Sequence, residues 1–553
     1  MAKGKLGERL ISMGIITPDQ LELALKEQKR TGKYLGEVIN SLGLATQEAV
    51  QTALAMQSGV NYVNLKDYLI DSEALRLVPE SFARKHMLIP LSVEGDTLSV
   101  AMANVFDLPT IDELQQMTGY FIDVNAASET DIQYAIDQYY GKAQTLEEVI
   151  QEAVRIAETE GAPALGEDAG AAPVIRLVDH LILDGIKQRA TDIHIEPERQ
   201  VVRTRYRIDG ILQQGISLPK TLQSALAARI KIMAGINIAE SRVPQDGRIL
   251  FHVGKRTIDL RISTMPTIYG EDIVIRILDK ENLILGLDKL GFSPEHIRTY
   301  KQLINRPHGI ILVTGPTGSG KTTTLYSTLS HINSLERSII TLEDPVEYEL
   351  TVIRQTQVNP KAGLTFATGL RSILRHDPDV IFIGEMRDSE TADMAIRSAL
   401  TGHLVLSTLH TNDAVGSVPR LLNMGVEPFL LASALIAVIA QRLVRVICPN
   451  CKTPYQPEER LLKRFKIPRD TGITFYHGEG CPSCKKTGYR GRIGIFEILN
   501  VTPSIESLIM ERKDSMVIKK AALSEGFITM EEDGIRKAKE GVTTLEEVER
   551  VVA

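Results

Sequence analysis

The stretch IILVTGPTGSGKTTTLY, residues 310–326, sets the architecture of this 553-residue chain. Its centre, GPTGSGKT at 315–322, matches the phosphate-loop pattern G-x-x-x-x-G-K-[ST] in full. Residues 310–314 predict a short buried strand and residues after 322 a helix, which is the context that the loop needs. A chance loop of this composition would not combine all three. The stretch therefore predicts a nucleoside triphosphate site.

Each part of the loop has a predicted task. Backbone N–H groups and the helix N-terminus surround the phosphates, Lys321 adds a point charge, and the Thr322 hydroxyl binds Mg²⁺. The predicted nucleotide-binding residues are Gly315, Pro316, Thr317, Gly318, Ser319, Gly320, Lys321, Thr322 and Thr323.

Three further buried strands are predicted at 338–342, 380–383 and 404–408. They run into Glu343, Glu385 and His410 respectively. In a parallel sheet whose first strand feeds a phosphate loop, these ends meet at one crevice. Carboxylates can orient and deprotonate water or hold the metal shell, and a donor can contact the γ-phosphate. The alternative for residues 343–347 is a solvated acidic turn.

These motifs carry a family resemblance. TGPTGSGKTTTLY, TLEDPVEY, LRHDPDVIFIGEMRD and TGHLVLSTLHTNDA resemble the Walker A, Asp-box, Walker B and His-box motifs of the secretion ATPase superfamily. The chain is most similar to the extension ATPases of type IV pili and type II secretion. The resemblance implies a RecA-like α/β motor domain that hydrolyses ATP with Mg²⁺. Because the Walker B strand ends in Gly-Glu, we expect Thr322 and Glu385 to share the Mg²⁺ shell. We favour Glu343 over Glu385 as the base.

The composition is that of an ordinary globular protein, with 43% hydrophobic and 24% charged residues. A net charge of -7 disfavours a non-specific nucleic-acid binder, which is normally basic. No apolar run follows Met1–Lys5, so we expect no signal peptide. The apolar stretch 429–440 is too short to span a bilayer and predicts a buried core helix. We expect a cytoplasmic protein without a transmembrane segment, reaching the membrane through partners.

The chain has four cysteines, in two C-x-x-C pairs: Cys448 with Cys451 and Cys481 with Cys484. Two such turns can place four thiolates around one tetrahedral Zn²⁺. The alternatives are reduced cysteines without a ligand or a redox pair. The resemblance also implies a tetracysteine zinc subdomain here, and we expect its zinc to be structural.

Arginines mark a domain upstream of the motor. Arg203, Arg205 and Arg207 alternate along one predicted strand, and a second group surrounds PQDG at 244–247. They form either a solvated strand face with local carboxylate partners or a set that reaches the triphosphate. The resemblance implies that this domain closes over the nucleotide, and the candidates are Arg203, Arg205, Arg242 and Arg248.

The N-terminus contains a repeat with a period of 29 residues, visible in Gly7 and Gly36, Gly14 and Gly43, and Gln28 and Gln57. Each copy predicts a helix, a glycine stop, a threonine cap and a second helix. It could be a docking module. It also resembles the cyclic di-GMP-binding N-domain of certain pilus ATPases, although Lys5 and Tyr34 replace the family's arginines. The resemblance suggests ligand contacts from Lys5, Leu6, Gly7, Arg9, Leu10, Gly14, Gln28, Tyr34, Leu35, Gly36, Ile39, Gly43, Gln57 and Asp107.

The predicted organisation has four parts. They are a helical-repeat regulatory or docking domain at 1–145, a flexible linker at 146–174, an α+β, PAS-like, arginine-rich domain at 175–285, and the motor at 286–553. The motor includes a zinc subdomain at 445–492 and C-terminal helices at 500–553. The resemblance implies a homohexamer that acts on an inner-membrane platform protein during pilus assembly. Type II secretion is the alternative, and a nucleic-acid-translocating ring is disfavoured.

Overall fold

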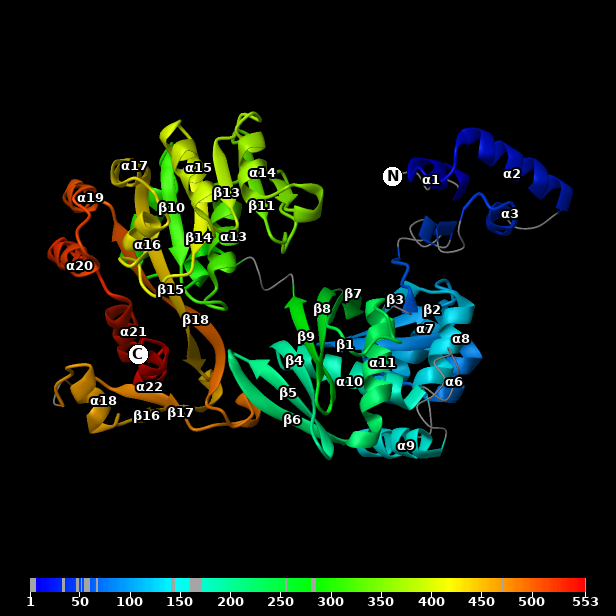
Figure 1. Cartoon of the computed structure of the whole chain (residues 1–553). Helices are drawn as coiled ribbons and strands as arrows, with labels where there is room; N and C mark the ends of the chain where they lie inside the picture. The colour runs from blue at the N-terminus through cyan, green and yellow to red at the C-terminus, as the bar shows by residue number, and fades with distance from the viewer. Residues whose placement is uncertain are drawn as a thin grey trace. The chain divides into compact units, whose positions relative to one another are not determined.

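Figure 1 shows the computed structural model of the chain, which describes residues 6–31, 35–45, 49–50, 52–53, 60–65, 68–140, 145–159, 172–253, 256–279, 285–469 and 472–552. Contacts between residues divide the chain into two units, Met1–Asp279 and Lys280–Ala553. The phosphate loop and the cysteines belong to the second unit, and the arginines and the repeat belong to the first.

A seven-stranded sheet forms the centre of the C-terminal unit, in the order β12-β11-β13-β14-β10-β15-β18. The strands are β10 (Gly309–Thr314), β11 (Ile339–Glu343), β12 (Arg354–Gln357), β13 (Val380–Ile383), β14 (Leu404–Leu409), β15 (Leu435–Ile447) and β18 (Tyr489–Asn500). Neighbours are parallel except β15 and β18, which are antiparallel. The predicted parallel motor sheet is thus confirmed, with one antiparallel edge strand.

Helices cover both faces of this sheet, which is why its inner strands are continuous apolar runs. Alternate residues of β10 point to opposite cores: Ile310 and Leu312 to one, Ile311 and Val313 to the other. The first core contains α14 (Phe366–Ile373), α15 (Ser389–Leu400), α16 (Ser417–Asn423) and α17 (Pro428–Ala434); the second contains α12 (Pro294–Leu303) and α13 (Lys321–Ile332).

The predicted core helix at 429–440 is wrong over its second half. Helix α17 ends at Ala434, and Leu435 begins β15, which pairs with β10 on one side and β18 on the other. The apolar run suits a strand that is buried on both faces. Periodicity alone does not separate such a strand from a buried helix.

A small cysteine-bearing subdomain lies between β15 and β18. Its described residues include a two-stranded sheet of β16 (Lys452–Tyr455) and β17 (Phe475–Gly478), and the α-helix α18 (Glu459–Arg464). The chain ends in the predicted C-terminal helices, α19 (Pro503–Met510), α20 (Ser515–Ser524), α21 (Met530–Lys539) and α22 (Leu545–Val552). Helix α22 packs with α18 in a shared apolar core.

The arginine-rich domain is an antiparallel sheet with helices on its apolar face, as the α+β prediction requires. The strands are β4 (Ala190–Pro197), β5 (Val201–Ile208), β6 (Ile211–Pro219), β7 (Gln245–Val253), β8 (Arg256–Thr267) and β9 (Gly270–Asp279), in the order β6-β5-β4-β9-β8-β7. The core beneath the sheet includes α10 (Ala172–Lys187) and α11 (Gln223–Ala234).

The predicted linker at 146–174 is wrong at both ends. Leu146–Thr159 forms helix α9, and α10 already begins at Ala172. Leu146, Val149 and Val154 pack against the core of the arginine-rich domain, which explains why this segment is ordered. The remaining linker residues, 160–171, lie outside the described residues.

Two smaller bodies precede α9. The first contains α1 (Leu6–Ser12), α2 (Pro18–Thr31) and α3 (Leu35–Ser41). In its first copy the predicted glycine stop and threonine cap are present: Gly14 has φ +70, and Thr17 and Gln20 cap each other's backbone N–H. The second has the sheet β1-β2-β3 and comprises α5 (Ser72–Leu77), α6 (Glu80–His86), β1 (Leu88–Glu94), β2 (Thr97–Met102), α7 (Leu108–Thr118), β3 (Phe121–Ala126) and α8 (Glu129–Tyr139).

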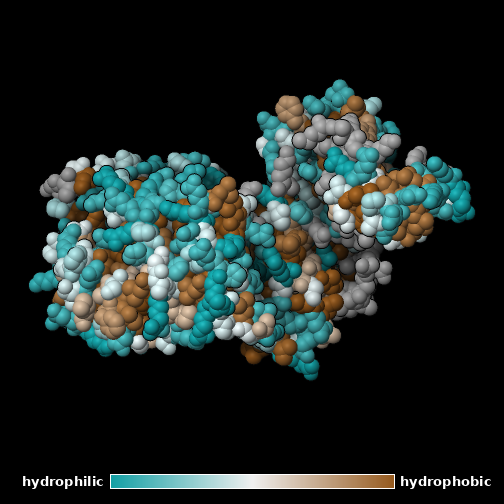
Figure 2. All heavy atoms as spheres, turned by 90° about the horizontal axis from the view of Figure 1, so that it is seen from above, coloured by the Kyte–Doolittle hydropathy of each residue, from teal (hydrophilic) through white to brown (hydrophobic). Residues whose placement is uncertain are grey.

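The surface seen in Figure 2 is mainly hydrophilic, with hydrophobic side chains scattered among the polar ones. Such mixing is normal where side chains face water. Within the described part of the chain, no helix combines the length and apolarity needed to cross a bilayer.

Candidate active site

The phosphate loop joins β10 to α13. Gly315 follows the last residue of β10, and Gly320 caps α13 with φ +88, a left-handed conformation that suits glycine. The residues from Pro316 to Gly318 are exposed, as is the Thr322 side chain at the start of α13. The loop therefore presents the free N–H groups of a helix N-terminus together with an accessible hydroxyl, a geometry suited to a phosphate and its metal ion.

Lys321 lies folded against its own loop. Its Nζ donates to the carbonyl oxygens of Gly315 at 2.7 Å and of Pro316 at 3.1 Å. Burial lowers the pKa of Lys321, while the negative charge of Glu385 acts in the opposite direction. A phosphate that enters the loop would replace these carbonyls as the lysine's partner.

The ends of the parallel strands gather the predicted acidic residues at the same sheet edge as the loop. Glu343 ends β11, and Glu385 and His410 follow β13 and β14. The carboxylates of Glu343 and Glu385 lie in different environments.

Glu343 is buried, with 3% of its surface exposed. Its carboxylate accepts hydrogen bonds from Tyr326, Thr341 and Gln355. Burial raises its pKa, although these three donors oppose the change. The solvated acidic turn is therefore wrong for Glu343. A carboxyl group with a raised pKa is a stronger base than an exposed one, but its lone pairs are already engaged here.

Glu385 faces the other charged groups of the site. Its carboxylate pairs with Arg387 and lies 3.4 Å from Nε2 of His410, whose side chain is 52% exposed. Arg387 also lies 3.8 Å from a carboxylate oxygen of Asp344 and so connects two of the motifs. Arg387 is not among the site residues predicted from the sequence. Its position two residues after Glu385, within GEMRD, was the available signal.

Each of the four predicted arginines has a carboxylate partner within the arginine-rich domain. In this structure the arginines therefore pair with nearby carboxylates, which is one of the two alternatives that the sequence allows. Arg242 is the most open to solvent, with 86% of its side chain exposed. The pairs are Arg203–Glu198, Arg205–Glu196, Arg242–Glu240 and Arg248–Asp259.

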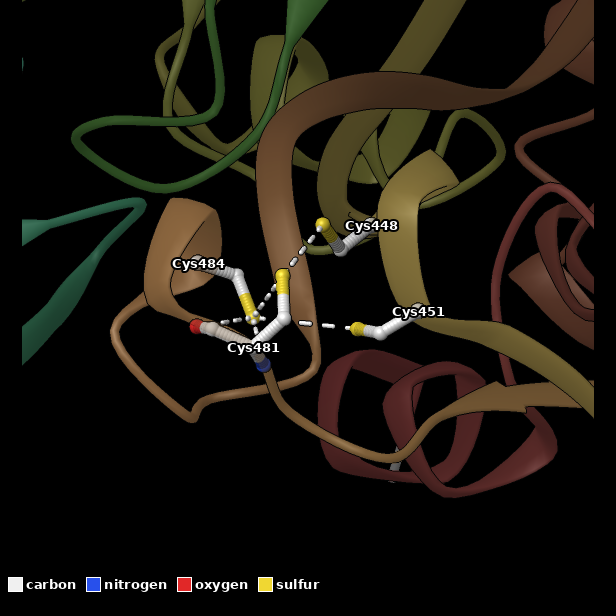
Figure 3. Close-up of side chains that lie close together, drawn as sticks. All are labelled: Cys448, Cys451, Cys481 and Cys484. Atoms are coloured by element: carbon white, nitrogen blue, oxygen red, sulfur yellow. Dashed lines mark hydrogen bonds between the residues drawn. The ribbon is translucent and has the colours of Figure 1, made fainter.

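The four cysteine side chains converge, as Figure 3 shows. Their sulfur atoms all lie within 4.8 Å of one another, and three of the separations are 3.7–3.8 Å. Zn–S bonds of about 2.3 Å in a tetrahedron require sulfurs about 3.8 Å apart, so the donor set fits zinc. The backbone N–H of Gly480 donates to the Cys451 sulfur, but burial still raises the pKa of Cys451. The N–H groups of Cys481 and Gly488 both donate to the Cys484 sulfur, which favours its thiolate. Burial raises the pKa of Cys484, but its N–H donors outweigh burial and bring it to about 6.

The repeat residues have a packing role that the sequence did not reveal. Leu10 and Ile39, two of the predicted ligand contacts, are completely buried in the core of the repeat. A methyl group on Gly7 would lie 2.4 Å from Leu21, and one on Gly36 would lie 2.9 Å from Val50. These glycines allow close packing between helices. Lys5, Tyr34 and Gln57 lie outside the described residues.

Asp107 is the N-cap of α7. Its carboxylate accepts from the backbone N–H and the hydroxyl of Thr110. The hydrogen bond from the Thr110 side chain contributes most to a lowered pKa of Asp107. The cap accounts for this residue without a ligand.

Comparison with known proteins places this site in a family. A family model described as "Type II/IV secretion system protein" matches residues 167–550, most of the chain. The chain belongs to this family. A second model, the MshEN domain, matches residues 58–146 and so begins after the repeat. The predicted membership of the secretion ATPase superfamily is confirmed.

Members of the family align along nearly the whole chain. The type IV pilus assembly ATPase PilB of Myxococcus xanthus is 43% identical over 99% of this chain and 98% of its own length. The type II secretion system protein E of Dickeya dadantii is 44% identical over 88% of this chain and 99% of its own. The X-ray structure of the Legionella pneumophila ATPase DotB covers 68% of this chain and 94% of its own, with a TM-score of 0.52 and 20% identity, and supports the fold.

Proposed function

We propose that the chain is a Mg²⁺-dependent ATPase motor that drives type IV pilus assembly. The observation that carries this proposal is the grouping of the phosphate loop, Glu343, Glu385 and His410 at one edge of the parallel sheet. Full-length similarity to a pilus assembly ATPase supports the pilus in particular. We further propose that six copies form a ring at the cytoplasmic side of the inner membrane and act on a platform protein there.

We assign the steps of hydrolysis as follows. The loop N–H groups and Lys321 would hold the phosphates. Thr322 and Glu385 would hold Mg²⁺, which would supply positive charge beside the phosphates. Glu343 accepts a proton from the attacking water once one of its donors turns away. His410 contacts the γ-phosphate from the end of β14. Arginines of the upstream domain, with Arg242 the most exposed, stabilise charge on the transferring phosphoryl group.

We also assign a structural Zn²⁺ to Cys448, Cys451, Cys481 and Cys484. All four positions of a tetrahedral ion would be filled by thiolates, which leaves none for catalysis. The role of this metal would be structural, because it would hold the two C-x-x-C turns of the small subdomain together.

The first test is ATP hydrolysis by the purified full-length chain, with Lys321→Ala as the matched inactive variant. We expect Mg²⁺-dependent turnover that falls by at least about 100-fold in the variant, since the phosphate-loop lysine stabilises the transferring group. Deletion of the gene in its source organism, followed by complementation with wild type or Lys321→Ala, tests the pilus. Loss of secreted proteins with normal pili would overturn the pilus assignment.

Type II secretion is the second candidate. The 44% identity with a type II secretion system protein E, over nearly all of that protein, favours it to a similar degree. The N-terminal repeat tilts the assignment towards pili through its resemblance to a cyclic di-GMP-binding domain.

Cyclic di-GMP control is a further part of the proposal. Calorimetric titration of the ligand into the full-length chain tests it, with Arg9→Ala and Gln28→Ala as binding variants. Glycine variants are unsuitable because Gly7 and Gly36 are needed for helix packing. Lys26→Ala is the control, because Lys26 is largely exposed and pairs only with Glu22 among the ion pairs of the described residues. We expect saturable binding that the first two variants weaken; no heat at high ligand concentration would leave the repeat as a docking module.

A further inference from the structure

A buried amide contacts both the phosphate loop and the first turn of the helix that follows it. Gln441 lies in the apolar strand β15 and is 2% exposed. Its Nε2 donates to the carbonyl oxygen of Ser319 at 2.8 Å, and its Oε1 accepts from the Thr324 hydroxyl at 2.7 Å. Ser319 belongs to the loop and Thr324 to the first turn of α13. One side chain therefore links both to the neighbouring strand.

The backbone of the loop also sits directly against this residue. A methyl group on Gly315 would lie 2.4 Å from the backbone oxygen of Gln441, and one on Gly320 would lie 2.7 Å from its Nε2. Both glycines have positive φ, +146 and +88. The shape of the loop thus depends on contact with β15 as well as on its own sequence.

We propose that Gln441 is a positioning residue of the nucleotide site. It does not contact the nucleotide itself. By fixing the Ser319 carbonyl and the first turn of α13, it aims the loop N–H groups and Thr322 at the phosphates. This inference rests on the proposed ATP hydrolysis at the same loop.

The physical reason is the cost of unpaired buried groups. Without the amide, the Ser319 carbonyl and the Thr324 hydroxyl would both lose their partner in a dry environment, and the loop would shift to find others. ATP and ADP share the phosphates held by the loop. A displaced loop therefore weakens binding in the ground state and the transition state alike, which raises KM and leaves kcat largely unchanged.

The main test uses full-length Gln441→Met, which keeps the volume of the side chain and removes both hydrogen bonds. We expect the Kd for a fluorescent ADP analogue and the KM for ATP to rise about tenfold, with kcat within about threefold of wild type. A variant that had merely lost folded protein would show the opposite pattern, a lower apparent kcat at unchanged KM.

A second variant, Gln441→Glu, adds a pH readout. A protonated carboxyl group can donate to Ser319 and accept from Thr324, whereas a carboxylate cannot donate. Burial favours the protonated form. We therefore expect its KM to be near wild type at low pH and to rise towards that of Gln441→Met as pH increases. A KM that falls towards the wild-type value as pH increases would contradict the inference, because the carboxylate cannot donate to Ser319.

Two controls complete the experiment. Gln302→Met makes the same change at an exposed position of α12 and should leave Kd and KM unchanged. Thr324→Val removes one of the two bonds and should give a smaller rise. If wild type fails to hydrolyse ATP, the proposed function fails while the ADP Kd still tests Gln441. If wild type is active and Gln441→Met keeps both constants within about twofold, the inference is overturned.

Discussion

At the scale of single residues, the two site carboxylates call for different tests. Glu343→Gln should reduce kcat by at least about 100-fold while ADP affinity stays within about threefold, because a neutral amide cannot accept the proton from water. Glu385→Gln should instead raise the Mg²⁺ concentration needed for half-maximal turnover. Steady-state kinetics over a Mg²⁺ titration checks both. The reversed pattern would make Glu385 the base.

The predicted arginines can be separated by the burial of their partners. Arg242→Ala should lower kcat at least about tenfold and leave ADP binding mostly intact, because Arg242 is exposed and its partner Glu240 is itself partly exposed. Arg248→Ala would also leave the buried carboxylate of Asp259 without its arginine, which should destabilise the fold. The melting temperature of this variant must therefore be measured together with its turnover. Arg199→Ala, an exposed change in the same domain, is the control. Unchanged turnover in the alanine variants of Arg203, Arg205, Arg242 and Arg248 would end the proposal.

At the scale of elements, the folding of the cysteine subdomain should depend on bound zinc. Elemental analysis should find one zinc per chain in wild type and in Ser483→Ala, and less in Cys451→Ser, which removes one of the four ligands. Replacement by Co²⁺ should give the thiolate charge-transfer absorption of a tetrahedral site. Wild type that is folded and free of zinc would show that the cysteines are reduced and without a ligand.

Helix α22 is attached to β15 by a buried carboxylate. Burial raises the pKa of Glu547, but its hydrogen bonds with Arg550 and Arg445 outweigh burial and bring it from 4.5 to about 2. A depressed pKa gives stability that is complete above pH 4.5 and lost as pH falls towards 2, worth no more than about 3 kcal/mol before solvent screening. In calorimetry, Glu547→Gln should lower the melting temperature at pH 7, and this difference should shrink as pH falls below 4.5.

Glu549 on the same helix provides a matched comparison. It pairs with Arg460, whose side chain is 63% exposed, and a pair of this kind contributes little to stability. Glu549→Gln should therefore melt close to wild type at pH 7. Equal losses from both variants would show that the arginine pairing of Glu547 is not special.

At the scale of the whole molecule, the proposed ring predicts a change of mass. With Mg²⁺ and a non-hydrolysable ATP analogue, light scattering should show a species of six times 61.1 kDa. Lys321→Ala, which binds the analogue poorly, should populate it less. A single-chain mass under all conditions would rule out the hexamer.

Local pattern predicted much of this molecule because each pattern is satisfied within a short segment. The order of strand, glycine loop and helix at 310–326 follows from periodicity and turn chemistry. So do the strands that lead to Glu343 and Glu385, and the helix-glycine-threonine pattern of the first repeat copy. The two C-x-x-C pairs likewise predicted a cluster that the fold brings together.

Features that depend on contacts between distant segments could not be predicted from the sequence. Residues 435–440, predicted as helix, form a strand because they pair with β10 and β18. Residues 146–159, predicted as linker, form a helix whose apolar side chains pack against the core of the arginine-rich domain. The burial of Glu343 and the contact of Gln441 with Ser319, 122 residues away in the chain, arose in the same way. Periodicity and spacing suffice to place the chemical groups of this site along the chain. Packing between distant segments decides which of those groups is buried and which partner replaces water in its hydrogen bonds. No local pattern encodes that packing.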